Sequence, residues 1–160
     1  MVEHNKYYYN INRNIPTEKI VWTNGCFDVL HIGHIKLFEY AKQQGTKLYV
    51  GVDSDEKVKE DKGLNRPFNT LDNRVSMLEA IKYIDRVFVF DNKDHLEWLI
   101  EGCSPDVMVI GGDWKGKTVV GEQYAKELKF FDRIPGYSTT KILEQKSYDY
   151  KAKNSTKRLG

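Results

Sequence analysis

The sequence predicts an α/β fold in which an open parallel sheet carries helices on both faces. Short apolar runs rich in β-branched residues recur along the chain, and stretches with apolar residues at helical spacing separate them. Strands that alternate with helices pair in parallel through right-handed crossovers, which places helices on both faces. In such sheets ligands bind at the carboxyl ends of the strands, so we expect function in the loops that follow them.

The first half of the chain contains two strand patterns and two helix patterns. KIVWT at residues 19–23 and KLYVGV at residues 47–52 have the composition of buried strands. A helix is expected over residues 33–44, between these strands. Residues 71–82 place apolar side chains at helical spacing and predict a second helix.

The second half repeats the alternation. Three further strand patterns lie at residues 86–90, at residues 107–110 and near Phe130. Three further helices are expected, over residues 96–101, as a weaker pattern over residues 122–128, and from about Ser138 onward.

Length and composition predict one globular domain with a short extension at each end. A chain of 160 residues, with 40% hydrophobic and 30% charged residues, fits a single core of ordinary composition. We expect residues 17–146 to form this domain, residues 1–16 an N-terminal arm, and residues 147–160 a polar, lysine-rich tail.

Composition also excludes several classes of protein. A net charge of +2 is too small to indicate a nucleic-acid binder, and no apolar run approaches the ~20 residues of a membrane helix. The N-terminus lacks the apolar region of a signal peptide. Cys26 and Cys103 indicate neither a disulfide framework nor a zinc site, so a cytoplasmic location is expected. An alternative hypothesis is a nucleic-acid-binding or scaffold protein that uses its arm and tail. It predicts strongly salt-dependent binding to DNA or RNA.

Two histidines follow the first strand, in the segment NGCFDVLHIGH at residues 24–34. His31 and His34 are three residues apart, so they share one face of the helix that begins there. A helix N-terminus already favours an anion, and two imidazoles add hydrogen-bond donors. Gly33 lets a ligand approach the backbone closely. Alternatively, one histidine caps the helix and the other packs against the sheet.

A second polar segment, RIPGYSTT at residues 133–140, precedes the last helix. Arg133 offers a fork of donors suited to phosphate oxygens. Ser138 and Thr139 offer hydroxyl and N–H groups at the helix N-terminus, or simply cap it. Both interpretations can hold, because a cap site is also an anion site.

A basic loop over residues 57–69 has the length of a mobile cover. We expect Lys57 and Lys59 to lie on a solvated face. Lys62 and Arg66, next to a glycine and a proline, are better candidates for contacts with a ligand.

GCFDVLHIGH resembles the G-x-F-D-x-L-H-x-G-H signature of the cytidylyltransferase-like nucleotidylyltransferases, and RIPGYSTTKI resembles their R-x-x-G-x-S-T-T-x-I segment. The resemblance covers about Ile20 to Leu143. It implies a Rossmann-like sheet of the HxGH type. It also implies an enzyme that transfers a nucleoside monophosphate from a nucleoside triphosphate to a phosphorylated acceptor and releases pyrophosphate.

Within this family, KGLNRPFN at residues 62–69 resembles the K-G-x-x-R-P-x-N element of the heptose 1-phosphate adenylyltransferases of ADP-heptose synthesis. That branch usually has Asn where this chain has Asp53, and often Tyr at the position of Trp114. Asp-Trp at residues 113–114 and Arg133 also fit the glycerol 3-phosphate cytidylyltransferases. Heptose 1-phosphate with ATP is therefore favoured, for lipopolysaccharide or capsule biosynthesis, and glycerol 3-phosphate with CTP is the alternative.

The resemblance also implies roles for particular residues, with Mg²⁺ as cofactor and no metal ligand among them. The catalytic residues would be His31, His34 and Lys62. The nucleotide would contact Cys26, Phe27, Gly33, Arg133, Ser138, Thr139 and Thr140. The acceptor would contact Asp28, Asp55, Arg66, Asp113 and Trp114. A homodimer is expected from the family, and a non-catalytic nucleotide-binding module is the alternative from another class.

Overall fold

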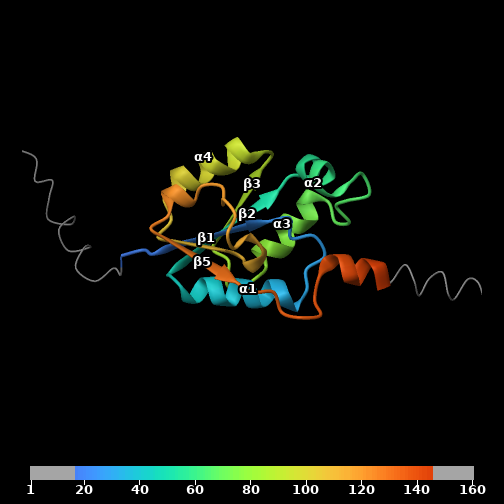
Figure 1. The fold of residues 1–160 in the computed structure, drawn as a ribbon, viewed down its shortest axis with the longest axis horizontal. Helices are drawn as coiled ribbons and strands as arrows, with labels where there is room; N and C mark the ends of the chain where they lie inside the picture. The colour runs from blue at the N-terminus through green and yellow to red at the C-terminus, as the bar shows by residue number, and fades with distance from the viewer. Residues whose placement is uncertain (1–16, 146–160) are drawn as a thin grey trace, which may run out of the picture.

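The protein is an α/β domain built on one sheet of five parallel strands, in the computed structural model that describes residues 17–145. Figure 1 shows its arrangement. The strands pair in the order β3-β2-β1-β4-β5. Their bounds are β1 Ile20–Gly25, β2 Lys47–Asp53, β3 Arg86–Phe90, β4 Val107–Gly111 and β5 Glu127–Phe131. The predicted arm and tail fall outside the described residues.

Four helices and two 3₁₀ turns connect these strands. The helices are α1 Ile32–Gln43, α2 Asp55–Lys62, α3 Leu71–Glu79 and α4 Lys93–Cys103, and the turns are η1 Gly112–Trp114 and η2 Glu122–Tyr124. A further helix over residues 139–145, which we call the C-terminal helix, follows β5. Its position confirms the helix expected from about Ser138.

Alternate residues of each strand enter two different cores, one on each face of the sheet. Val21, Val107 and Val109 pack against α1 and α3, where Phe38 and Leu78 are buried. Residues one position along, such as Trp22 and Met108, pack on the opposite face against Leu96 and Ile100 of α4. The prediction of a parallel sheet covered on both faces is confirmed.

Two expectations about local structure are wrong. The helix expected over residues 122–128 is only the single turn η2, and Leu128 lies in β5, paired with Met108 of β4. Pairing with the sheet overrides a weak helical pattern there. The expectation of a basic loop over residues 57–69 is also partly wrong, because its first residues form α2 and only the chain after Lys62 is irregular.

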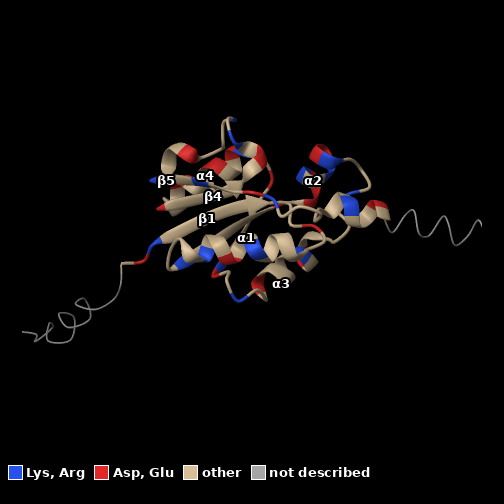
Figure 2. Cartoon of the chain, turned by 60° about the horizontal axis from the view of Figure 1, so that its bottom comes forward, with Lys and Arg blue, Asp and Glu red and all other residues tan. Residues whose placement is uncertain are grey.

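The carboxyl ends of the strands gather the segments that matter for function. The strands point toward the end of the molecule where α2 and the C-terminal helix lie (Figure 2). The segment after the central strand β1 therefore lies between those that follow β2 and β4. Among residues 17–145, no helix has the length and apolar character needed to cross a bilayer.

Candidate active site

A cavity of about 750 Å³ opens at the carboxyl ends of the strands. It brings together most of the residues singled out from the sequence: Cys26, Phe27, Asp28, His31, Gly33, His34, Lys62, Asp113, Trp114, Arg133, Ser138, Thr139 and Thr140. Asp55 and Arg66 are not among the residues that line it. The sheet thus unites two segments that lie about a hundred residues apart in the sequence.

The two histidines are held by the backbone at the start of α1. His31 is the N-cap residue, and its Nδ1 accepts a hydrogen bond from the N–H of Gly33 at 3.0 Å. The N–H of His31 in turn donates to Nδ1 of His34 at 3.2 Å. A ring nitrogen that accepts carries no proton, so the proton of each neutral ring lies on Nε2. Each histidine therefore caps the helix and keeps one N–H donor for a ligand.

Both imidazoles are neutral at pH 7. Burial, assisted by the charge of Arg133, lowers the pKa of His31. Burial lowers the pKa of His34 to about 4, with further contributions from His31, Lys62 and Arg133. The ring centroids lie 4.0 Å apart. Two neutral donors beside the N–H groups of α1 form a site suited to an anion.

Gly33 is required by the position of the His31 ring. A Cβ on Gly33 would lie 2.8 Å from Cε1 of His31, closer than such atoms approach in proteins. Tyr137 stacks on this ring, with centroids 6.4 Å apart. The ring is thus positioned between α1 and the segment that precedes the C-terminal helix.

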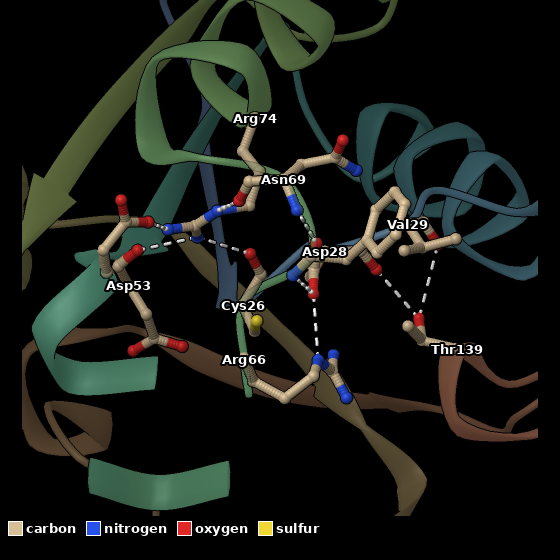
Figure 3. A network of polar contacts seen from close by, with 10 residues as sticks. Cys26, Asp28, Val29, Asp53, Arg66, Asn69, Arg74 and Thr139 are labelled. Atoms are coloured by element: carbon tan, nitrogen blue, oxygen red, sulfur yellow. Dashed lines mark hydrogen bonds and ion pairs between the residues drawn. The ribbon is translucent and has the colours of Figure 1, made fainter. Parts of the chain in front are cut away.

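The loop between β1 and α1 has an unusual backbone. Phe27 and Val29 both have φ of 48°. Residues other than glycine rarely adopt such angles, and a β-branched residue such as Val29 is strained there. The hydroxyl of Thr139 donates to the carbonyl oxygens of Asp28 and Val29, at 2.9 and 3.3 Å (Figure 3). The C-terminal helix therefore holds the strained loop in place.

Asp28 lines the cavity, but its carboxylate is occupied by the segment after α2 (Figure 3). It accepts hydrogen bonds from Nε of Arg66 at 3.0 Å and from the N–H groups of Phe68 and Asn69 at 2.7 and 2.9 Å. Burial alone would raise the pKa of Asp28, but these hydrogen bonds outweigh it and hold the pKa below its usual value. Asp28 and Arg66 thus fix this segment beside the cavity.

Arg74 is a residue of the site that the sequence interpretation missed. Its guanidinium is fully buried and donates to the carbonyl oxygens of Cys26, Asp53 and Asn69, at 2.7 to 3.1 Å. It also pairs with Asp55, at 2.7 Å. Asp55 is therefore engaged by α3 and does not line the cavity.

A signal for Arg74 was present in the sequence. It lies three residues after Leu71 and four before Leu78, so it occupies the apolar face of the helix over residues 71–79. A charged residue at such a position is buried only when it is paired.

α2 brings lysines to the cavity. Lys62 is its last residue, and its charge contributes to lowering the pKa of His34. The expectation that Lys57 lies on a solvated face is wrong. Its side chain is only 14% exposed, it lines the cavity, and its Nζ lies 2.6 Å from Oδ2 of Asp61. Lys59 is exposed, as expected.

The opposite side of the cavity carries Arg133 in an ion pair with Asp113, at 2.5 Å. Both side chains are more than half exposed, and exposed pairs contribute little stability, so an incoming phosphate can compete for Arg133. Trp114 is half exposed beside them. The hydroxyl of Ser138 accepts from the N–H of Lys141 at 3.2 Å, so Ser138 caps the C-terminal helix.

Residues 17–145 contain no group of three or more His, Cys, Asp or Glu side chains that could hold a metal ion. Cys26 and Cys103 are both free, and burial raises the pKa of each thiol.

A parallel α/β sheet with two neutral imidazoles, helix N-termini and an arginine at its strand ends forms a site for phosphate groups, as a nucleotidyltransferase requires. The chain belongs to the cytidylyltransferase-like family, whose model matches residues 22–145. The family suggested by the two sequence motifs is thereby confirmed.

Among curated proteins, the chain is 45% identical over 136 residues to the bifunctional protein HldE of Helicobacter hepaticus, which covers 85% of this chain and 28% of that protein. It is 47% identical over 126 residues to the protein of the same name from Campylobacter fetus, covering 79% of this chain and 27% of that one. The chain therefore spans less than a third of the length of these relatives.

Solved structures confirm the fold. The lipopolysaccharide core biosynthesis protein of Thermoplasma volcanium superposes with a TM-score of 0.58 at 24% identity, over 76% of this chain and 99% of that one. The pantothenate synthetase of Thermus thermophilus superposes with a TM-score of 0.53 at 13% identity, over 75% and 58%.

Proposed function

We propose that this chain transfers a nucleoside monophosphate from a nucleoside triphosphate, preferably ATP, to a sugar phosphate, preferably heptose 1-phosphate. The observation that carries the proposal is the histidine pair. Both Nδ1 atoms accept from backbone N–H groups, which leaves two neutral Nε2–H donors for an anion in the cavity. The relatedness to the HldE proteins supports the transferred group and the sugar.

In the proposed reaction, an oxygen of the acceptor phosphate attacks the α-phosphorus in line, and pyrophosphate leaves from the opposite side. The protein contributes mainly position and charge stabilisation. His31 and His34 donate to the α-phosphate oxygens as negative charge grows on them, and each such donor is typically worth ~3–4 kcal/mol in the transition state. Lys62 adds a positive charge from the end of α2.

Arg133 and the start of the C-terminal helix would bind the β- and γ-phosphates. Arg133 exchanges Asp113 for phosphate oxygens in this proposal. The hydroxyl of Thr139 is already bound to the loop after β1, so its contribution to the nucleotide would come from its backbone N–H. Thr140 and the N–H of Ser138 complete this anion site.

Mg²⁺ fits this site when it is bound by the triphosphate, without a set of protein ligands. Asp28 and Asp113 line the cavity, but their carboxylates are already engaged by Arg66 and Arg133. Mg²⁺ commonly keeps its waters and binds substrate phosphates, where it neutralises their charge. The donors that stabilise the α-phosphate in this proposal are the chain's own.

The runner-up is a cytidylyltransferase acting on glycerol 3-phosphate with CTP. Asp113, Trp114 and Arg133, which suggested it from the sequence, lie together on one side of the cavity. We also propose a homodimer in the cytoplasm, and two free thiols support the reducing location.

Pyrophosphate release tests the proposal directly. The four nucleoside triphosphates are combined with heptose 1-phosphate, hexose 1-phosphates, glycerol 3-phosphate and other polyol phosphates in the presence of Mg²⁺. We expect the largest kcat/KM for ATP with heptose 1-phosphate, and a clear preference, because a hydrogen-bonding base pocket leaves polar groups unpaired with the wrong base.

Other outcomes select the alternatives. A maximum at CTP with glycerol 3-phosphate assigns the chain to the runner-up. Nucleotide binding without pyrophosphate from any combination supports the non-catalytic module. Sedimentation velocity at several concentrations tests the dimer.

A further inference from the structure

The cavity has two chemically different sides, set by the strand order. β2 and β3 lie on one side of β1, and β4 and β5 lie on the other. Arg133 and Ser138 follow β5 and form the anion-binding side. Asp53, at the end of β2, and Lys57 and Asp61 of α2 line the opposite side. If the triphosphate occupies the first side, the acceptor occupies the second.

Asp53, Lys57 and Asp61 form one ionic array. Nζ of Lys57 lies 2.6 Å from Oδ2 of Asp61 and 4.0 Å from Oδ1 of Asp53. The side chains of Asp53 and Lys57 are 15% and 14% exposed, whereas that of Asp61 is 54% exposed. The spacing of four residues places Lys57 and Asp61 on the side of α2 that faces the cavity, and Asp53 lines the cavity from the end of β2. α2 carries both signs of charge (Figure 2).

Lys57 is charged within this array. Burial alone would lower the pKa of Lys57, but the hydrogen bond to Asp61 and the charge of Asp53 outweigh it and raise the pKa. Burial raises the pKa of Asp53. Two carboxylates face one ammonium, so the array has no free positive charge for a phosphate. It offers several acceptors and the remaining N–H donors of the ammonium.

Hydroxyl groups match this arrangement, because each can donate to a carboxylate and accept from an ammonium. The acceptor's phosphate would then be directed toward His31 and His34 and toward Lys62, whose positive charge lies at the end of α2. We propose that Asp53, Lys57 and Asp61 bind the hydroxyl-bearing part of the acceptor and determine acceptor selectivity; this inference rests on the proposed nucleotidyl transfer.

The array is not required to hold α2. The carboxylate of Asp61 is half exposed, and surface ion pairs four residues apart on a helix add little to stability. α2 is attached through buried Val58 and begins at Ser54, whose hydroxyl accepts from the N–H of Lys57. Replacing the side chains of the array should therefore leave the fold intact.

The test uses the variants Lys57→Met and Asp61→Asn, with Lys59→Met as the matched control on the exposed face of α2. Pyrophosphate release is measured over a range of acceptor concentrations at saturating nucleotide, and over a range of nucleotide concentrations at saturating acceptor. We expect the acceptor KM to rise about 10- to 100-fold in both variants, which corresponds to the loss of a hydrogen bond to a charged group. The nucleotide KM and kcat should stay within about twofold, and Lys59→Met should match the wild type.

Selectivity provides a second readout. The ratio of kcat/KM for the preferred sugar phosphate to that for glycerol 3-phosphate should fall at least about tenfold in both variants. Glycerol 3-phosphate has fewer hydroxyl groups, so it loses fewer hydrogen bonds in the variants. Thermal melting checks the fold. If Lys57→Met does not fold, Asp61→Asn, which alters a half-exposed side chain, decides alone.

The failures are distinguishable. An active wild type with unchanged acceptor KM in the variants overturns the subsite and leaves the proposed function standing. Equal rises in the KM of acceptor and nucleotide also overturn it. A wild type without turnover on any pair overturns the proposed function, and the subsite with it.

Discussion

Individual side chains at this site have two tasks, one in the fold and one in the chemistry. His31 caps α1 through Nδ1 and offers Nε2 to the cavity. Ser138 caps the C-terminal helix at the place where the sequence resemblance puts the phosphates. The sequence left capping and binding open, and the geometry is compatible with both, because His31 uses Nδ1 for the cap and keeps its Nε2–H for an anion.

We expect His31→Ala or His34→Ala to lower kcat by ~10²–10³, because each removes a donor that acts chiefly on the transition state. Nucleotide KM should change little. Steady-state pyrophosphate release measures both constants. Wild-type kcat in both variants would contradict the assignment of the histidines.

The pKa of His34 also predicts how stability depends on pH. The unfolded chain takes up this proton near pH 6.5, whereas the folded chain does so only at about 4. Between these values the unfolded state binds more protons, so stability falls as the pH falls, by no more than about 3 kcal/mol from this residue. Urea unfolding at pH 7, 6, 5 and 4 should show a smaller acid loss for His34→Gln than for the wild type. His95→Gln, outside the cavity, is the control, and parallel curves for the wild type and His34→Gln would refute the linkage.

Secondary structure elements differ in how far the sequence predicts them. Buried strands such as β2 and β4 are evident from apolar composition, because both faces of the sheet are covered. α2 was missed because DEKVKEDK buries only Val58 and has no apolar periodicity. Its signals are electrostatic: Ser54 at the N-cap, acidic residues in the first turn and lysines in the last.

The contacts that assemble the site could not be predicted from local sequence. Arg74 joins the ends of β1 and β2 to the segment at Asn69. The carbonyl groups at the strand ends are distant from Arg74 in the sequence, and Asn69 lies before the start of its helix. Which carbonyl oxygens lack a partner at a strand end depends on how the loops meet, and only the folded structure specifies this.

We expect Arg74→Lys to lower the free energy of unfolding by about 3 kcal/mol, because one ammonium cannot reach all the acceptors that the buried guanidinium serves. Urea unfolding at pH 7 measures the change. Arg86→Lys, at an exposed arginine above the ring of Tyr49, is the matched control and should change stability by less than about 0.5 kcal/mol. Equal changes in the free energy of unfolding for Arg74→Lys and Arg86→Lys would contradict a stabilising role for the contacts of Arg74.

Taken as a whole, the part of the chain that the structure describes supplies a large cavity. Among residues 17–145, those that line it run from Asn24 to Thr140. Deleting residues 147–160 should therefore leave kcat/KM within about twofold in the pyrophosphate assay. Loss of turnover would contradict this.

The same deletion addresses the nucleic-acid hypothesis. Fluorescence anisotropy with labelled DNA and RNA at several salt concentrations should detect no specific binding by the full chain. Strongly salt-dependent binding that disappears with the tail would support the hypothesis instead.

The hydroxyl of Thr139 reaches back across 111 residues of sequence to the carbonyl of Asp28. Contacts between residues so far apart in the chain are slow to form, because loop closure costs entropy before any contact compensates it. The five strands end at Phe131, so the sheet can assemble before this clamp exists. During synthesis on the ribosome, the histidine loop would stay unclamped until almost the entire domain has emerged. In refolding experiments, turnover should therefore recover later than the burial of Trp22, and activity would report the final step of folding.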